Sequence, residues 1–251
     1  MEHIEIFGVK IHNITFQYAV REIESYLKGE GLKVIYTPNP EIVMGAKEDE
    51  SLKNLLNRGD LITADGIGLI YAAKIKKKPL KERVTGYDLS LKLLDLANEN
   101  GLALYLLGGK EGVAKKAAEN IKKDYPNIRI AGYHHGYFKG SHNDKPGHEE
   151  ERKIIEEINS SNPDIIFVGL GFPKQEIWID SNRDKVKGKL IIGNGGVMDI
   201  LSGNLSPTPD FIRKLGFEWL HRLLREPSRI KRQMILPKFM LQVILTKDVV
   251  R

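Results

Sequence analysis

The fold is decided by the stretch from Asp164 to Trp178, which reads DIIFVGLGFPKQEIW. Five consecutive apolar or small residues, Ile165 to Gly169, are typical of a strand that is covered on both faces in a parallel sheet. Gly171 permits a sharp turn after the strand, and Pro173 suits the first position of a helix. Such a helix start offers free amide groups to an anionic ligand such as a diphosphate. A plain strand-to-helix connection explains the glycines equally well.

The rest of the chain repeats this unit of a short apolar strand and a helix of about ten residues. The further expected strands are Lys33–Tyr36, Leu61–Thr63, Ala103–Leu107, Ile128–Ala131 and Leu190–Gly193. The expected helices of the core are Phe16–Leu27, Glu41–Ala46, Ser51–Asn57, Ile67–Ile75, Asp88–Asn100, Val113–Lys123, Glu149–Asn159 and Glu176–Val186. A short hairpin to about Ile11 precedes them. The alternation predicts an α/β fold with a Rossmann-like, mostly parallel sheet and helices on both faces.

The net charge divides the chain into two parts. Residues 207–251 hold ten basic and four acidic residues, which accounts for the net charge of +6 of the whole 251-residue chain. The first 206 residues are therefore neutral. We predict an α/β catalytic core over residues 1–206 and a basic, helical appendage over residues 207–251 that requires an anionic partner.

Composition excludes several classes of protein. The chain has no cysteine, so disulfides, thiolate metal sites and a thiol nucleophile are excluded. Neither a signal peptide nor an apolar stretch of membrane-spanning length is expected. No GxGxxG opens the first βαβ unit and no GxxxxGK[ST] occurs, which disfavours hydride transfer and P-loop chemistry. The absence of an Asp-x-Asp pair points away from a metal-bound diphosphate.

Parallel sheets bind ligands outside the carboxyl ends of their strands, so the residues that follow each strand are the candidates for a site. They are Thr37, Asn39, Asp65, Gly108, Gly109, Gly171 to Glu176 and Asn194 to Asp199. Glycine and small polar side chains in this set suit a nucleotide or a sugar phosphate. Asp65 is placed to accept a proton from an attacking hydroxyl, although an aspartate before a helix most often caps that helix.

Two further groups are open to more than one interpretation. His134, His135, His142 and His148 lie in and beside a polar loop, and their spacing fits no common zinc pattern, which favours a solvated loop. The appendage combines basic residues with apolar ones at helical spacing, from Phe211 to Leu224 and again from Arg229 to Val250. This composition suits the surface of an anionic membrane, and it suits an ordinary docking helix as well.

Several strings, taken in order, closely resemble the WecG/TagA/CpsF glycosyltransferases over about Ile4 to Arg232. They are TPNPEIV, TADGIGL, RVTGYDL, LLGG, GLGFPKQEIW, MDILSG and FEWLHRLLREPSRIKR. The arrangement is most similar to the TagA branch. That resemblance implies inverting transfer of N-acetylmannosamine from UDP-ManNAc to the 4-hydroxyl of GlcNAc-diphosphoundecaprenol, with a β-1,4 linkage, in the synthesis of the wall teichoic acid linkage unit.

The resemblance also implies roles for particular residues. Asp65 is the expected general base, and we assign Thr37 to catalysis with it. The expected substrate-binding residues are Asn39, Arg83, Gly108, Gly109, Gln175, Glu176, Asn194, Gly195, Asp199, Arg222, Arg229 and Arg232. The three last arginines are expected to fold over the site and steady the diphosphate, so neither a metal nor another cofactor is needed. Asn194 departs from the family's usual valine, and residues 206–209 depart from its usual Arg-Ala-Pro.

We therefore expect a cytoplasmic enzyme that is peripheral on the inner face of the cell membrane. Its expected partners are a UDP-sugar donor, an undecaprenyl-diphosphate-linked GlcNAc acceptor and an anionic membrane surface, but no nucleic acid. Homo-oligomerisation is left open. The appendage is expected to dock on the bilayer and to complete the pocket there. The alternatives are a related donor such as UDP-ManNAc-uronate, a nucleotide-sugar epimerase or dehydrogenase, and a non-enzymatic module that binds nucleic acid.

Overall fold

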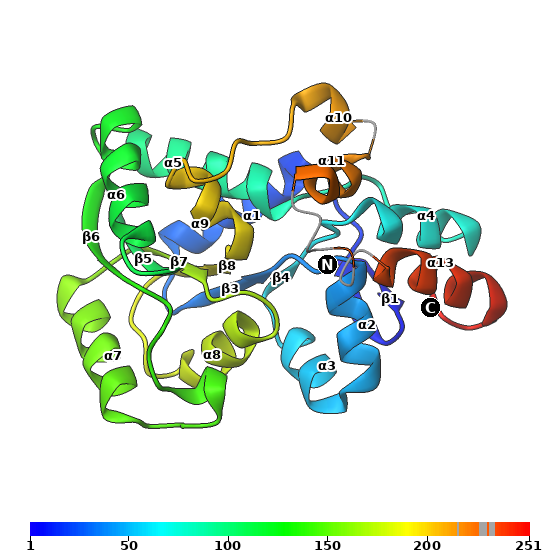
Figure 1. Ribbon diagram of the computed structural model, residues 1–251, viewed down its shortest axis with the longest axis horizontal. Coiled ribbons are helices and arrows are strands. Elements are labelled where there is room, and N and C mark those ends of the chain that lie inside the picture. Colours follow the sequence, from blue (N-terminus) through cyan, green and yellow to red (C-terminus); the bar gives the residue numbers. More distant parts are fainter. Residues whose placement is uncertain (215, 226–229, 231–233) are drawn as a thin grey trace.

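Six parallel strands form the central sheet of the protein, in the order β4-β3-β8-β7-β5-β6 (Figure 1). The computed structural model describes residues 1–214, 216–225, 230 and 234–251. The strands are β3 (Lys33–Tyr36), β4 (Leu61–Ile62), β5 (Ala103–Gly108), β6 (Arg129–His134), β7 (Ile165–Gly169) and β8 (Leu190–Gly193). Helices cover both faces of this sheet, which confirms the predicted α/β, Rossmann-like fold.

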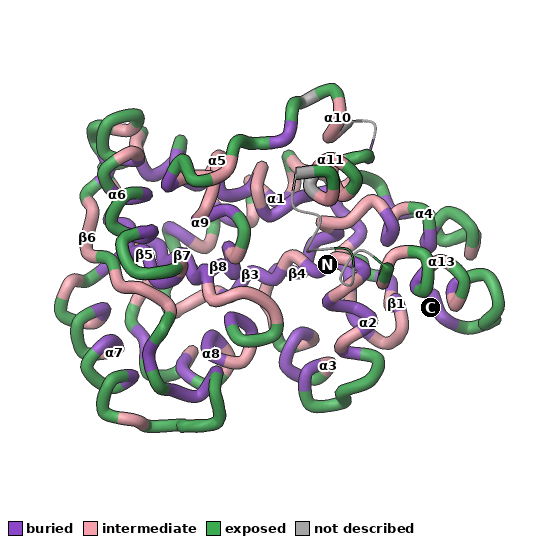
Figure 2. Tube along the Cα trace, in the orientation of Figure 1, coloured by how far each residue is buried: buried purple, intermediate pink, exposed green. Residues whose placement is uncertain are grey.

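Alternate residues of the central strands bury opposite faces in two hydrophobic clusters. Ile165 and Phe167 of β7 point to one cluster, and Ile166 and Val168 point to the other. The first cluster includes side chains of α1 (Phe16–Lys28), α5 (Gly86–Asn100), α6 (Val113–Asp124) and α9 (Gly195–Leu201). The second includes side chains of α2 (Pro40–Glu48), α3 (Glu50–Leu56), α4 (Ile67–Ile75), α7 (Glu149–Ser161) and α8 (Lys174–Asn182). Figure 2 shows the buried strands between these helices.

The N-terminal hairpin is present as predicted. Strands β1 (His3–Ile6) and β2 (Val9–His12) are antiparallel, and Gly8 has the positive φ of +81° that their turn requires. This hairpin is separate from the central sheet. Its first strand pairs instead with the far end of the chain, where Ile6 forms an antiparallel bridge with Val250.

The C-terminal segment is more broken than the sequence indicates. The expected continuous helix from Phe211 onward is wrong, because α10 (Asp210–Lys214) and α11 (Glu218–Arg225) are separated at Gly216, whose φ is +78°. A further helix, α13 (Ile235–Leu245), packs on α2 and α4 and buries Phe239 and Val243 completely. Among the described helices, none has the length and apolarity that crossing a bilayer requires. The division at residue 206 stays a prediction.

Two details near the site differ from expectation. Pro173 occupies the N-cap position of α8, so this helix begins at Lys174, and it ends at Asn182, well before Val186. Helix α9 was not expected at all, because its first two residues are glycines of low helix propensity. It nevertheless forms, with Met198 fully buried against the central strands.

Candidate active site

The carboxyl ends of the parallel strands open onto a cavity of about 750 Å³. Segments that follow all six strands contribute to its lining. The predicted site residues that line it are Thr37, Asn39, Asp65, Gly109, Gln175, Asn194, Gly195 and Asp199. The fold thus brings together side chains that are up to 162 positions apart in the sequence, from Thr37 to Asp199.

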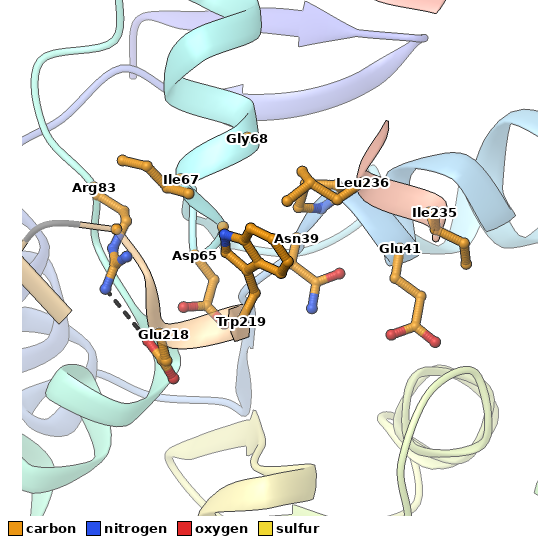
Figure 3. A pocket seen from close by; sticks show the side chains of 13 residues that line it. Asn39, Glu41, Asp65, Ile67, Gly68, Arg83, Glu218, Trp219, Ile235 and Leu236 are labelled. Atoms are coloured by element: carbon orange, nitrogen blue, oxygen red, sulfur yellow. Dashed lines mark hydrogen bonds and ion pairs between the residues drawn. The ribbon is translucent and has the colours of Figure 1, made fainter. Parts of the chain in front are cut away.

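A smaller cavity of about 160 Å³ adjoins the first. The residues that line both are Asn39, Glu41, Asp65 and Glu218. The apolar wall of the smaller cavity comes from α4, α11 and α13, through Ile67, Trp219, Ile235 and Leu236 (Figure 3). Two compartments of different chemistry therefore meet at Asp65, one mostly built by strand ends and one closed by the C-terminal helices.

Asp65 follows β4 without acting as a helix cap. Its backbone N–H donates to the carbonyl oxygen of Pro38 at 3.0 Å, which ties the end of β4 to the loop after β3. The N-cap of α4 is Gly66, and no side-chain cap hydrogen bond is present there. The interpretation of Asp65 as a helix cap is therefore wrong. Asp65 lines both cavities, and Figure 3 shows its side chain among the residues of the smaller one.

The loop after β3 is fixed by a helix start and a glycine contact. Asn39 caps α2, because its Oδ1 accepts a hydrogen bond from the N–H of Ile42 at 3.1 Å. Thr37 lies against Gly86 at the start of α5, so closely that a Cβ on Gly86 would sit 2.7 Å from Thr37 Oγ1. The absence of a side chain at position 86 thus permits the close approach of Thr37 to α5.

Arg83 reaches the smaller cavity and pairs with the C-terminal segment. Its guanidinium lies 3.5 Å from the carboxylate of Glu218 on α11, and both side chains are largely buried (Figure 3). A second ion pair, between Arg213 and Asp88 at 2.6 Å, joins α10 to α5. These contacts hold the C-terminal helices over the carboxyl edge of the sheet.

The floor below β8 is polar and buried. Asn194 is 1% exposed, and its Oδ1 lies 2.7 Å from the Ser90 hydroxyl, which is also 2.6 Å from the Gly86 carbonyl oxygen. A hydroxyl has one proton to donate, so Ser90 can donate to only one of these two oxygens. Asn194, the departure from the family pattern, thereby connects α9 to the start of α5, which contacts Thr37.

Charge is distributed unevenly along the cavity. The described lysines of the larger cavity are Lys110 after β5 and Lys174 at the start of α8. The carboxylates of Glu41, Asp65 and Glu218 lie where the two cavities meet, and a fourth carboxylate, Asp199 of α9, lines the larger cavity alone. The lysine end suits phosphate groups, and the carboxylate end suits hydroxyl groups that donate hydrogen bonds or give up a proton.

Some predicted residues do not line the cavities. Gly108 belongs to β5 and lies against Gly169, where a Cβ would sit 2.4 Å from the Gly169 carbonyl oxygen. Glu176 is fully buried behind Gln175. Arg222 lies on α11, but the structure does not describe its side chain. Arg229 and Arg232 lie outside the described residues altogether. Their predicted roles stay predictions.

The histidine-rich loop contributes to the cavity wall. His142 lines the larger cavity and packs on Phe138, with the ring centroids 4.5 Å apart. Burial is the main cause that lowers the pKa of His142 below its usual value. No group of three or more potential metal-binding side chains occurs in the described part of the chain.

Sequence reasoning missed several lining residues. They are Glu41, Tyr87, Lys110, Tyr137, Phe138 and Glu218, whereas Lys174 lies within the predicted range Gly171 to Glu176. Lys110 directly follows the predicted glycine turn at Gly108 and Gly109, and that adjacency was the available signal. Tyr137 stands in an irregular loop three residues beyond β6, where no periodic pattern marks a lining residue.

Comparison with known proteins found a matching family and similar, named relatives. The family model described as "Glycosyl transferase WecG/TagA/CpsF family" matches residues 4–249. A relative from Bacillus spizizenii is 35% identical over 220 residues, covering 88% of this chain and 82% of the relative. A relative from Staphylococcus aureus strain MRSA252 is 33% identical over 246 residues, covering 97% of this chain and 93% of the relative. Both are named N-acetylglucosaminyldiphosphoundecaprenol N-acetyl-beta-D-mannosaminyltransferase.

Proposed function

This chain belongs to the WecG/TagA/CpsF family of glycosyltransferases, and we propose that it transfers N-acetylmannosamine from UDP-ManNAc to GlcNAc-diphosphoundecaprenol. The names of its relatives support this sugar and this lipid acceptor. The products are UDP and a ManNAc-GlcNAc disaccharide on diphosphoundecaprenol, which is a step in the synthesis of the wall teichoic acid linkage unit. The single observation that carries the proposal is the position of Asp65, which lines both a strand-end cavity and an adjoining, partly apolar one.

The chemistry is a direct displacement with inversion. The 4-hydroxyl oxygen of the acceptor attacks the anomeric carbon of the donor while the bond from that carbon to the β-phosphate oxygen breaks. Asp65 accepts the hydroxyl proton, and UDP leaves with the bonding electrons. Backbone amides at the strand ends and the basic residues of the C-terminal segment stabilise the negative charge on UDP. The predicted roles of Arg222, Arg229 and Arg232 belong to this step.

The order of the strands suggests how the donor lies. Asp65 follows β4 at one edge of the sheet, Lys110 and Lys174 follow β5 and β7, and Tyr137 follows β6 at the opposite edge. A donor stretched along this edge places its sugar near Asp65, its diphosphate near the lysines and its uracil on Tyr137. The acceptor then enters from the smaller cavity, whose apolar wall suits the first isoprene units.

Tyr137 provides a test of this orientation. Its ring is 72% exposed yet lines the cavity, so a uracil base can stack on it. Tyr137→Ala should raise the dissociation constant for UDP-ManNAc about 5- to 150-fold, since stacking of a base on an aromatic ring contributes roughly 1–3 kcal/mol. Isothermal titration calorimetry measures this.

Two variants serve as controls for Tyr137. Tyr137→Phe keeps the ring and should bind the donor normally. Tyr133→Ala removes a ring that is 43% exposed on the neighbouring strand β6 but lines neither described cavity. Equal affinity of Tyr137→Ala and the parent for UDP-ManNAc would show that the uracil does not stack on Tyr137.

The C-terminal segment supports a membrane-bound place of action. It carries many of the large apolar side chains that are exposed among the described residues: Phe211, Phe217, Leu220, Leu224, Ile230, Met234, Leu241, Ile244 and Leu245. Together with the basic excess after residue 206, these side chains suit the anionic inner face of the cell membrane, where the lipid acceptor lies. Docking there would bring the smaller cavity to the acceptor.

The proposed reaction is tested by the release of UDP from UDP-ManNAc with a GlcNAc diphospholipid acceptor, measured in EDTA. Acceptor-dependent release that survives chelation supports metal-independent transfer. Release with UDP-ManNAc-uronate alone would shift the proposal to that donor. No release with either donor, from a folded protein in the presence of anionic vesicles, would contradict the proposal.

A further inference from the structure

The end of α4 carries a dense group of lysines, here called the α4 lysines: Lys74, Lys76, Lys77 and Lys78. Lys76 is partly buried and the other three are exposed, and residues 66–81 include no acidic residue. Within the described part of the chain, none of the four forms an ion pair. The charges of residues 1–206 sum to zero, yet this end of α4 is strongly basic.

The turn that ends α4 holds a lysine where the backbone favours glycine. Lys77 has a positive φ of +58°, which is the left-handed conformation. Its N–H donates to the carbonyl oxygen of Lys74 at 3.1 Å, and the N–H of Lys78 donates to that of Ala73 at 2.9 Å. This pattern usually ends a helix at glycine, and a lysine in the same place is strained. A charged side chain kept at a strained position points to a function for that charge.

Exposed apolar side chains of α4 and α13 lie beside the line along which these two helices pack. Gly68 faces α13, because a Cβ there would sit 2.8 Å from Leu236. Tyr71 and Ile75 share the face of α4 that includes Gly68, and they are 48% and 46% exposed. On α13, Ile244 shares the face that includes Leu236 and is 59% exposed. A basic surface and an apolar one are therefore adjacent at the end of α4.

The position of this surface is related to that of the smaller cavity. Ile67 of α4 and Ile235 of α13 line that cavity, so both helices begin there. From this place both run toward the same edge of the molecule (Figure 1). Tyr71 stands about 6 Å further along the axis of α4 than Ile67, given the rise of an α-helix. A partner that held this edge would lie close to the smaller cavity.

We propose that the α4 lysines, with Tyr71 and Ile75 and the exposed face of α13, form a docking surface for the anionic headgroups of a lipid bilayer. Ammonium groups attract anionic lipids, and the apolar side chains beside them enter the boundary between headgroups and acyl chains. A nucleic acid offers phosphates but no apolar phase, so it leaves the apolar side chains without a partner. The inference rests on the proposed function, because the lipid acceptor lies in the membrane, and it adds the core to the C-terminal segment as a membrane contact.

Sedimentation of the full-length protein with vesicles tests this surface. The vesicles contain phosphatidylglycerol and phosphatidylcholine, and vesicles of phosphatidylcholine alone measure the binding that does not depend on charge. The triple variant Lys76→Gln, Lys77→Gln and Lys78→Gln should bind the anionic vesicles about 100-fold more weakly than the parent, since each lysine near such a surface contributes about 5-fold. Unchanged binding by this variant would refute the docking surface.

A second triple variant on α6 provides the matched control: Lys115→Gln, Lys116→Gln and Lys123→Gln. It lowers the net charge of the chain by the same amount, and its lysines are exposed. Helix α6 packs on β5 and β6 at one end of the sheet, whereas α4 follows β4 at the other end (Figure 1). The control should bind anionic vesicles like the parent. An equal loss in both triple variants would mean that net charge alone decides binding, against the inference.

Lys77→Gly separates a role in docking from a role in the fold. Glycine relieves the strain of the positive φ, so the melting temperature should rise by about 2–4 °C. The affinity for anionic vesicles should nevertheless fall about 5-fold, because one charge is lost. A variant that gained stability and kept the vesicle affinity of the parent would contradict a function for this charge.

Release of UDP with two forms of the acceptor distinguishes the docking surface from the proposed reaction. The α4 lysines line neither described cavity, so their triple variant should match the parent with a water-soluble, short-chain acceptor and be slower with an acceptor in vesicles. Vesicle binding that depends on the α4 lysines, without UDP release from either acceptor, would support the surface and contradict the reaction. Binding of the parent to duplex DNA but not to anionic vesicles would overturn the surface.

Discussion

Asp65→Asn is expected to lower the turnover number for N-acetylmannosamine transfer by about 10²- to 10⁴-fold, the range that a general base contributes. Asparagine keeps the shape of the side chain but cannot accept the proton of the attacking hydroxyl. The backbone hydrogen bond from Asp65 N–H to the Pro38 carbonyl oxygen does not involve the side chain and is kept in the variant. The dissociation constant for UDP-ManNAc should therefore change little.

Single-turnover kinetics with the lipid acceptor, together with donor binding by calorimetry, separates the two effects. Asp95→Asn provides the matched control, because Asp95 is exposed on α5 and lines neither described cavity. A variant at position 65 that turned over as fast as the parent would require another base. Glu41 and Glu218 would be the next candidates, since both line the two cavities that meet at Asp65.

Phe239→Ala should destabilise the whole protein by about 3–5 kcal/mol, the usual cost of truncating a fully buried aromatic side chain. Phe239 of α13 is 0% exposed and lies in the same hydrophobic cluster as α2, α4 and the N-terminal hairpin. Its ring meets that of Phe7 edge to face, with the centroids 5.8 Å apart. The change therefore removes packing that joins the C-terminal segment to the core.

Equilibrium unfolding in urea measures this effect. Leu241→Ala on the same helix is the control, because Leu241 is 56% exposed and its truncation should change the free energy of unfolding by less than about 0.5 kcal/mol. Equal stability of the two variants would mean that α13 is not held on the core in solution. Activity should fall with Phe239→Ala as well, because α13 supplies Ile235 and Leu236 to the smaller cavity.

The packing of α13 also changes how the C-terminal segment can be tested. Removing everything after residue 206 takes away Phe239, Val243 and the bridge between Val250 and Ile6, so buried surface of the core would be exposed. A loss of activity in that truncation would not distinguish a missing active-site cover from a destabilised fold. Point changes on α11, such as Trp219→Ala, leave those contacts in place and are the cleaner test of closure.

The central elements were predictable because their signals are local and strong. Ile165–Gly169, Leu190–Gly193 and Ile67–Ile75 have the predicted bounds, since apolar runs of these lengths end at glycine or at a polar turn. Helix α9 escaped prediction because tertiary packing of Met198 outweighs the poor propensity of two glycines. The break at Gly216 lies inside a pattern that is apolar on both sides, so helical spacing alone could not reveal it.

The residues of the site were predicted from a single rule about parallel sheets. The carboxyl ends of parallel strands share one edge, and this rule alone brought Thr37, Asp65 and Gln175 together. It cannot tell which strand-end residues face the ligand, so it placed Glu176 in the pocket although its side chain is buried below. The rule also does not predict Tyr137 as a lining residue, because its position depends on the path of an irregular loop.

The adjoining cavities have a consequence for inhibitors. In the proposed orientation a uridine-like head group occupies the larger cavity and an apolar chain occupies the smaller one, and each alone would bind weakly. A single compound whose linker spans the larger cavity and passes Asn39 and Asp65 makes the second binding event intramolecular, with the highest effective concentration when the linker length matches that span. Such a bisubstrate compound would gain affinity from both cavities and would need no reactive group.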